Sequence, residues 1–194
     1  MSFLKKIFSK TSSKEQEAKK QEVHLSLDDA FVHHFLEKGG KFLYCISETE
    51  VSNNLVRILE ENQWNKVTCI DKNLKNYLKG KKAKIAADFD LTIPFFTSCE
   101  HLISDNGDIL FSSNQLSTHK IASLTENFIV FAKTSQLVKN TGQGLTGIKS
   151  NCKNNIPTNI SAVKNYTLKK DDDSFLNYGN SNSKNLYLLL LEDL

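Results

Sequence analysis

Apolar and polar positions alternate in two short segments near the middle of the chain, residues 101–104 and 109–112, and this pattern predicts a β-hairpin. The segments are joined by Asp105-Asn106-Gly107-Asp108. Asn-Gly is the dipeptide that most readily supplies the two positive φ angles of a two-residue type I′ turn. A nearly continuous apolar run at 128–132 is typical of a strand covered on both faces. We therefore expect the hairpin and this strand to lie in the middle of one sheet.

The first half of the chain alternates between helical and strand-like periodicity. Ser26 and Ser47 each precede an acidic residue by three positions, which is the arrangement of a capping box at the start of a helix. Strands are expected at 41–46, 66–70 and 85–87, and a short helix is expected from Asp71 to Leu78. Strand and helix alternate in units of about 25 residues, as in right-handed βαβ crossovers onto a parallel sheet.

The rest of the chain adds fewer elements. Residues 89–96 contain Pro94 and are interpreted as an apolar connection into the hairpin. A helix is expected from beyond Val138 to about Lys149, and strands near 160–163 and at 186–191, the last of which closes the sheet. The fold class predicted is one α/β domain over 25–194, with a mostly parallel central sheet flanked by helices plus an antiparallel hairpin.

Charge is concentrated at the N-terminal end. The net charge is +3, and the first 20 residues hold six lysines and two glutamates, so the remaining chain is close to neutral. A neutral body argues against nucleic acid as a partner. Residues 1–24 read as a disordered basic arm. The alternative is a weak membrane-surface or partner-docking helix in residues 1–10, because Phe3, Leu4, Ile7 and Phe8 share one helical face.

No metal or cofactor is expected from the sequence. The four cysteines are far apart without a Cys-x-x-Cys pair, as for free thiols in a reducing compartment, and a cytoplasmic location follows from the same reasoning. His33 and His34 are adjacent on a helix, so their side chains should diverge by about 100° and not share a metal. No apolar run approaches the roughly 18 residues needed to span a bilayer. Three consecutive aspartates at 171–173 are interpreted as a solvated charge run within a polar insertion.

Two other motifs are also interpreted as structural. Residues 142–147 spell G-x-G-x-x-G, but the residues before them already look helical, so no nucleotide-binding strand-to-helix turn is expected there. The lysine-rich segment 79–84 is interpreted as a solvated loop rather than an anion site. His119, beside Lys120, is the histidine best placed for a ligand site, with a surface loop as the alternative reading.

The order of the pieces from Glu100 to Val138 resembles the LUD domain, the lactate-utilisation protein C family. The hairpin turn looks like the family's acidic-Thr-Gly-Thr turn, and residues 114–120 look like its Gly-rich loop, with Lys120, or His119 after a one-residue shift, at the basic position. Residues 156–159 and the C-terminal strand stand in the places of the family's later elements. The resemblance covers residues 25–194 and implies an α/β sheet similar to CoA transferases, ribose-5-phosphate isomerase and formyltetrahydrofolate cyclo-ligase.

Two segments depart from the family. Its Ser-Gly-Pro-Ser-Arg-Thr-Ala-Asp-Ile-Glu stretch has no counterpart after Ile160, and its Gly-Val-His-Gly-Pro is replaced by Ser181-Asn182-Ser183-Lys184. The resemblance thus implies an accessory component of lactate utilisation, beside iron–sulfur partner proteins, with a degenerate ligand pocket. Catalysis is undecided, and the isolated chain is expected not to be an enzyme.

The alternative is an enzyme or binder of CoA-linked, phosphorylated or folate-like anions. Its ligand-binding residues would be the turn residues, the following serines and the basic pair: Asn106, Gly107, Ser112, Ser113, His119 and Lys120.

Overall fold

A computed structural model describes residues 25–86, 88–151, 156–167 and 182–193. Its centre is a six-stranded, all-parallel sheet in the order β1-β10-β7-β4-β2-β3. The strands are β1 Lys41–Cys45, β2 Lys66–Thr68, β3 Lys84–Ala86, β4 Phe95–Ser98, β7 Asn127–Lys133 and β10 Asn185–Leu191. The predicted α/β class with a mostly parallel central sheet is confirmed.

Alternate residues of the central strands separate two cores. Phe128 and Val130 of β7 face the core that contains α1 (Leu27–Glu37), whereas Ile129 and Phe131 face the core that contains α2 (Glu48–Glu61). The period-2 geometry of a strand produces this division, and both sets of side chains are buried. The apolar run at 128–132 therefore lies in a strand covered on both faces, as expected.

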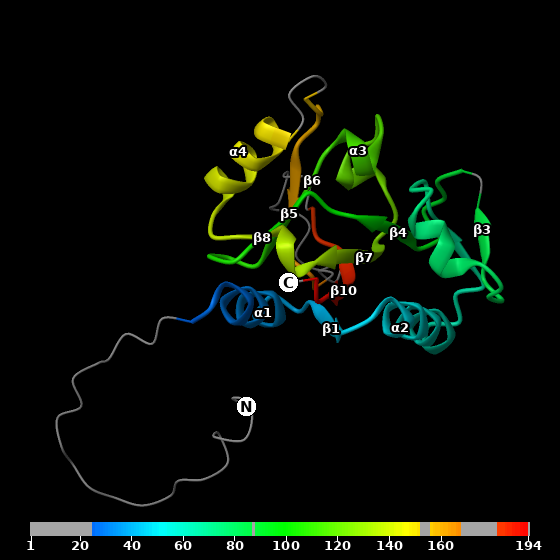
Figure 1. Ribbon diagram of the computed structural model, residues 1–194. Helices are drawn as coiled ribbons and strands as arrows, with labels where there is room; N and C mark the ends of the chain where they lie inside the picture. Colours follow the sequence, from blue (N-terminus) through cyan, green and yellow to red (C-terminus); the bar gives the residue numbers. More distant parts are fainter. Residues whose placement is uncertain (1–24, 87, 152–155, 168–181, 194) are drawn as a thin grey trace, which may run out of the picture.

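A second sheet is mixed and has the order β8-β5-β6-β9. Its strands are β5 His101–Ile103, β6 Asp108–Phe111, β8 Leu137–Val138 and β9 Ser161–Val163. Helix α4 (Thr141–Asn151) contacts β5 and β8. Figure 1 shows α4 on the opposite side of the molecule from α1 and α2. The G-x-G-x-x-G segment lies wholly within α4, so it is not a nucleotide-binding turn.

The predicted caps of the first two helices are present. The Ser26 hydroxyl accepts from the backbone N–H of Asp29 at 3.4 Å, and the Ser47 hydroxyl accepts from that of Glu50 at 3.3 Å. Asp71 accepts from the N–H of Asn73 at 2.8 Å and precedes the 3₁₀ helix η2 (Leu74–Leu78). The contacts of Ser47 and Asp71 fix where the crossovers after β1 and β2 begin, and the contact of Ser26 fixes the start of α1, which precedes β1.

The hairpin differs from its prediction in two respects. It belongs to the second sheet rather than to the middle of the main one. Its loop has four residues, with Ile103 paired to Asp108, and only Gly107 has positive φ, at +70°. The prediction of a two-residue type I′ turn is therefore wrong. The N–H of Gly107 instead bonds the carbonyl of Ile103 at 2.7 Å, as in a longer loop closed by a left-handed glycine.

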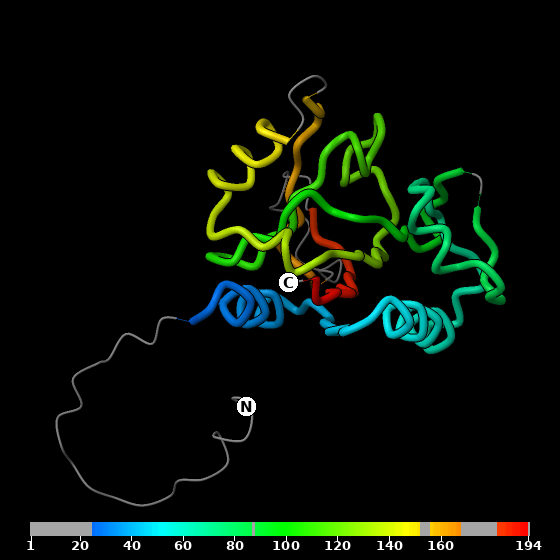
Figure 2. Tube along the Cα trace, viewed as in Figure 1, coloured from blue at the N-terminus to red at the C-terminus, as the bar shows by residue number. Residues whose placement is uncertain are grey.

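Two strands of the main sheet also differ from expectation. Residues 89–96, interpreted as an apolar connection, include the first two residues of β4, a central strand. Pro94 stands just before the strand, where its missing N–H breaks no ladder bond. The carbonyl of Pro94 accepts from Thr68 at 2.9 Å. The last strand, β10, lies between β1 and β7 rather than closing the sheet, and Figure 2 shows this red segment inside the molecule.

Residues 134–138, expected to be helical, instead form the 3₁₀ turn η4 (Thr134–Gln136) followed by β8. The expectations for the arm at 1–24 and for most of the polar insertion, with its aspartates, lie outside the described residues. Among the described residues, no helix has the length and apolar character needed to cross a bilayer.

Candidate functional site

A polar cavity of about 630 Å³ opens at the carboxyl edge of the main sheet. Its walls come from the first turns of α2, from η2 and from the ends of β4 and β7, where Ser98 and Lys133 stand. The chain goes from β2 outward to β3 and returns to β4 on the other side of β2. Ligands of open α/β sheets bind where the strand order reverses in this way. The fold thus identifies this cavity as the first candidate site.

The cavity can receive a small anion with hydrogen-bonding groups. The N-terminus of α2 carries partial positive charge toward it, and Lys81 and Lys133 line it. Glu48 and Asp71 line it too, so its charged side chains include both signs. The ammonium of Lys133 lies 3.8 Å from the Asp193 carboxylate and is about half exposed, so it can turn to a ligand.

Aromatic side chains form part of the same wall. The rings of Tyr77 and Phe131 lie 5.5 Å apart between centroids. Burial, followed by the charge of Glu48, raises the pKa of Tyr77, so its phenol stays protonated and can donate a hydrogen bond. Asp71 is occupied by backbone N–H groups of η2, and the Ser98 hydroxyl lies 3.5 Å from its second oxygen. The arrangement suits binding through lysine and hydroxyl groups rather than nucleophilic attack.

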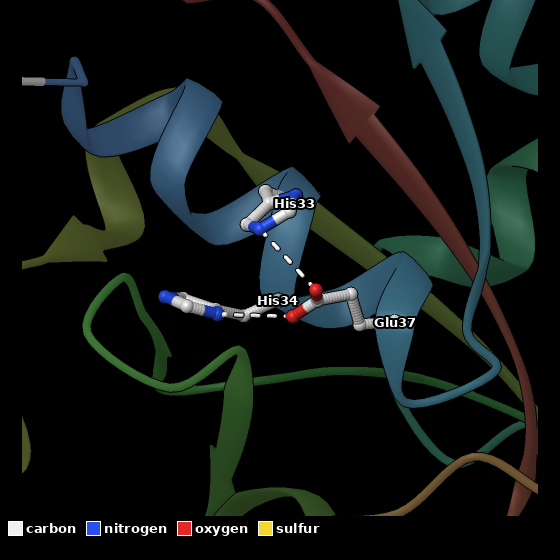
Figure 3. Close-up of side chains that lie close together, drawn as sticks. All are labelled: His33, His34 and Glu37. Atoms are coloured by element: carbon white, nitrogen blue, oxygen red, sulfur yellow. Dashed lines mark ion pairs between the residues drawn. The ribbon is translucent and has the colours of Figure 1, made fainter. Parts of the chain in front are cut away.

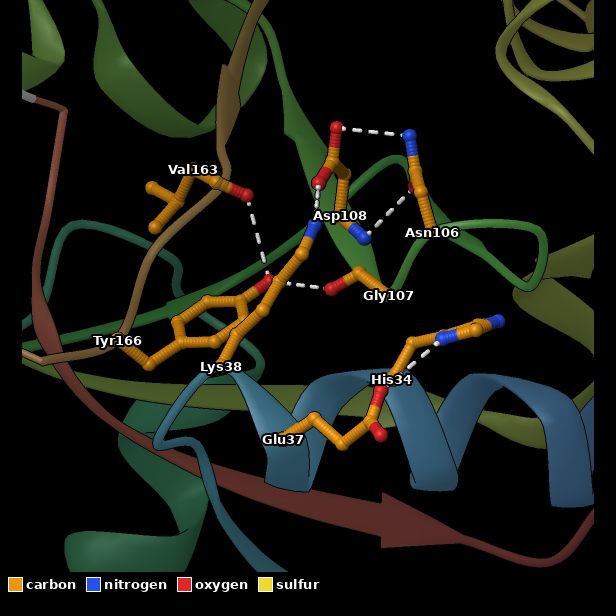
Figure 4. Close-up of polar contacts among 8 residues, drawn as sticks. All are labelled: His34, Glu37, Lys38, Asn106, Gly107, Asp108, Val163 and Tyr166. Carbon is orange, nitrogen blue, oxygen red and sulfur yellow. Dashed lines mark hydrogen bonds and ion pairs between the residues drawn. The ribbon is translucent and has the colours of Figure 1, made fainter.

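Asn106 and Gly107, predicted as ligand-binding, lie in the hairpin turn against α1 (Figure 4). The Asn106 amide donates to the Asp108 carboxylate at 3.0 Å, and Lys38 donates to the same carboxylate at 2.8 Å. The buried hydroxyl of Tyr166 donates to the carbonyl of Gly107 at 2.5 Å. These groups bond one another, so the turn is a structural joint between α1 and the second sheet.

Ser112 and Ser113 lie at the other end of β6, and Ser112 is about 17 Å from Gly107 at the usual rise of a strand. Ser112 caps the short helix α3 (Ser113–Leu116) and donates to Glu100 at 2.5 Å. Ser113 exchanges hydrogen bonds with the backbone of Thr158 at 2.9 and 3.0 Å. Both hydroxyls are therefore engaged within the protein.

His119 and Lys120 follow α3 and precede the 3₁₀ turn η3 (Ile121–Ser123). The His119 ring packs on Phe89 with centroids 4.5 Å apart, and its carbonyl accepts from Asn159 at 2.7 Å. Lys120 is exposed. The structure thus brings the two serines and His119 together through residues 158–159. It does not bring them to the hairpin turn or to the carboxyl-edge cavity.

The two segments that depart from the resemblance meet before β10. Asn182 donates to the carbonyl of Ala162 at 3.3 Å, and the backbone N–H of Lys184 donates to the carbonyl of Asn165 at 3.1 Å. The buried ammonium of Lys184 donates to the carbonyls of Leu124 and Thr125 at 2.9 and 3.0 Å. Burial lowers its pKa to about 8. The ammonium of this lysine is hydrogen-bonded to the backbone and is not directed toward a ligand site.

The described thiols are unsuited to nucleophilic chemistry. Cys45, Cys69 and Cys99 are free and buried. Burial raises the pKa of all three, that of Cys69 to about 11, so each is a neutral thiol near pH 7. The fourth cysteine, Cys152, lies outside the described residues.

Sequence reasoning named no residue of the carboxyl-edge cavity as a site residue. A usable signal was present, because Asp71 and Lys133 follow or end recognised strands, and carboxyl ends of parallel strands meet at one edge. Ser98 could not be found in this way, since its strand was interpreted as a connection. The lysine-rich sequence around Lys81 indicates a solvated loop rather than a site.

Comparisons with known proteins bear on the whole chain. The family model described as the LUD domain matches residues 13–191. A crystal structure of a DUF162 family protein from Deinococcus radiodurans is similar with a TM-score of 0.61 at 11% sequence identity, over 87% of this chain and 99% of that chain. No curated protein matches the sequence.

Proposed function

The chain belongs to the LUD domain family, and from this premise we propose that it is an accessory component of lactate utilisation. In this role it works beside iron–sulfur partner proteins that oxidise lactate to pyruvate. The chain itself carries out no step of that oxidation.

The observation that supports an accessory role is the environment of Lys184. The family's Gly-rich and Arg-containing segments are replaced in this chain, and the lysine at the second replacement donates to two backbone carbonyls. Its neighbours Asn182 and Asn165 bond backbone groups as well. A buried cation whose donors are used in this way is occupied by the backbone and is not available to bind an anionic substrate.

Affinity purification of the tagged full-length chain from its native cells, grown with lactate, tests this role. We expect an iron–sulfur protein or a lactate-oxidising subunit to co-purify in comparable amount, as identified by mass spectrometry. An unrelated protein with the same tag is the control. Recovery of the chain without either kind of subunit would contradict the proposal.

A second candidate function is the binding of a CoA-linked, phosphorylated or folate-like anion, and the carboxyl-edge cavity favours it. The cavity combines Lys81 and Lys133 with the N-terminus of α2, and these groups attract phosphate and carboxylate oxygens. Its volume, about 630 Å³, is in the usual range for small-molecule sites. This binding would not require the serines or the hairpin turn.

A thermal-shift screen of the full chain with CoA esters, sugar phosphates, folates and lactate tests the second candidate. A ligand present at 100 times its Kd stabilises the folded state by about 2.7 kcal/mol, which gives a readily measured shift. Stabilisation by one class of anion supports binding, and a flat response to every class rejects it while leaving the accessory role intact.

A further inference from the structure

The exposed face of α1 carries a cluster of three potential metal ligands, His33, His34 and Glu37. Adjacent histidines on a helix were expected to diverge, but here both rings turn toward the same carboxylate (Figure 3). His33 Nε2 lies 3.4 Å from Oε1 of Glu37, and His34 Nδ1 lies 3.5 Å from Oε2. Side-chain rotation thus compensates for the 100° between successive residues.

These separations match the edges of a zinc coordination shell. Zn–N bonds of about 2.0–2.1 Å and Zn–O bonds of about 2.0–2.2 Å place neighbouring ligand atoms of a tetrahedral site roughly 3.4 Å apart. A charge-assisted hydrogen bond between imidazolium and carboxylate would be shorter, about 2.7–2.9 Å. The two distances end on different oxygens of Glu37. One atom from each residue would bind the ion, and these three atoms lie within 4.8 Å of one another. The side chains must therefore approach by at most about 1.4 Å to complete the shell.

The core side of α1 is fixed by packing, and the side that carries the cluster is exposed to solvent. Phe31 and Phe35 bury the opposite face of α1 in the core, so the helix is a rigid support. A Cβ at Gly107 would lie 2.9 Å from that of His34, which places the hairpin turn directly against this residue. The side chains of His33 and Glu37 are 57% and 59% exposed, so an ion can reach them.

We propose that His33, His34 and Glu37 form a binding site for a transition-metal dication, with Zn²⁺ as the best match. The site uses Nε2 of His33, Nδ1 of His34 and one oxygen of Glu37. Two imidazoles and a single carboxylate favour zinc over Mg²⁺ or Ca²⁺, which take mainly oxygen ligands. Three protein ligands leave a fourth position for water or for a donor atom of a bound molecule. This site is independent of the proposed role in lactate utilisation.

Zinc titration of the full-length chain, with any polyhistidine tag removed, tests the proposal. We expect one equivalent of Zn²⁺ to bind, and Mg²⁺ to compete poorly. The variants H33A, H34A and E37Q should each weaken zinc binding at least tenfold. H119A and E61Q are matched controls, since they remove an imidazole and a helical carboxylate elsewhere on the protein, and they should leave the Kd unchanged.

The absorption spectrum of bound Co²⁺ distinguishes a site with nitrogen and oxygen ligands from a site with cysteine thiolate ligands. Co²⁺ bound to the cluster should give ligand-field bands without a sulfur-to-cobalt charge-transfer band, because all three donors are nitrogen or oxygen. No saturable zinc binding would overturn the proposal, as would binding that survives when H33A, H34A and E37Q are combined in one variant, or a charge-transfer band from cysteine. Far-ultraviolet circular dichroism confirms that each variant is folded.

Discussion

At the scale of single residues, Gly107 is the most constrained position in the hairpin turn. Its φ is +70°, and a Cβ there would lie 2.6 Å from the backbone nitrogen of Phe35. Its carbonyl also accepts from the buried hydroxyl of Tyr166. The residue was singled out from sequence as a ligand donor, but its contacts explain its presence by backbone conformation and close packing on α1.

Replacement of Gly107 by alanine should therefore lower the free energy of unfolding by more than the cost of the strained backbone conformation alone. A non-glycine residue at positive φ costs about 1–2 kcal/mol, and the contact with α1 adds to it. Gly80 is a matched control, because its φ is +72° and a Cβ added there would meet no atom within 4 Å. Urea unfolding should show G107A to be clearly less stable than G80A. Equal losses in the two variants would contradict this account of the joint.

The ion pair between Lys38 and Asp108 gives a second residue-scale prediction. The Asp108 side chain is only 5% exposed and accepts from Lys38 at 2.8 Å. Removal of the cation by K38M leaves a buried carboxylate with one remaining side-chain donor, the Asn106 amide, and should destabilise the fold by about 2 kcal/mol.

The control for this pair is Arg57 and Glu61 on α2, which are exposed and 3.9 Å apart. R57M should change stability by no more than about 0.5 kcal/mol in the same unfolding experiment. If K38M were as harmless as R57M, Asp108 would be solvated in solution and the joint between α1 and the hairpin would be weaker than described.

At the scale of elements, local signals in the sequence predicted most helices and strands. Ser26 and Ser47 marked helix starts because their hydroxyls cap the backbone within three residues, which depends on no distant contact. Strand order could not be read in the same way. The apolar residues of β10 indicate burial, but its place between β1 and β7 depends on contacts with strands 50 or more residues away. Pro94 concealed β4, because a proline before a strand and a proline within a loop look alike.

Lys184 connects β10 to the segment before β7, and this connection should depend on pH. Burial lowers its pKa to about 8 from the usual 10.5, so the unfolded chain holds this proton more tightly than the folded one. Stability from this group therefore rises as pH increases from about 8 to 10.5, and it is lost over the same interval as pH falls, with no further change below about 8. Between pH 7 and 9.5 the gain relative to K184M should be about 2 kcal/mol.

Denaturant unfolding of the wild type and K184M at the two pH values measures this difference, and the other titrating groups cancel between the proteins. A difference in unfolding free energy that is the same at pH 7 and 9.5 would show that Lys184 is solvated. It would also remove the main support for an accessory role.

At the scale of the whole molecule, the sequence predicted the family and the fold class but not the position of the carboxyl-edge cavity. The residues chosen as ligand donors, such as Ser112 and Asn106, are polar because they cap a helix and close a turn. The cavity combines side chains from α2, η2 and the ends of two strands. In the sequence these residues extend from Glu48 to Lys133, which are 85 positions apart. Such a set becomes visible only when the strand order is known.

The central claim about the candidate site, made as the second candidate function, is that a small anion would bind at the carboxyl edge of the main sheet and not at the loop after the hairpin. The most direct test compares K133Q with K120Q in a ligand titration followed by thermal shift. Both substitutions remove one exposed lysine charge, the first at the cavity and the second in the loop. We predict that the best anion of the panel binds about tenfold more weakly to K133Q and unchanged to K120Q. Weaker binding only in K120Q, or no stabilisation of the wild type by any anion, would contradict the claim.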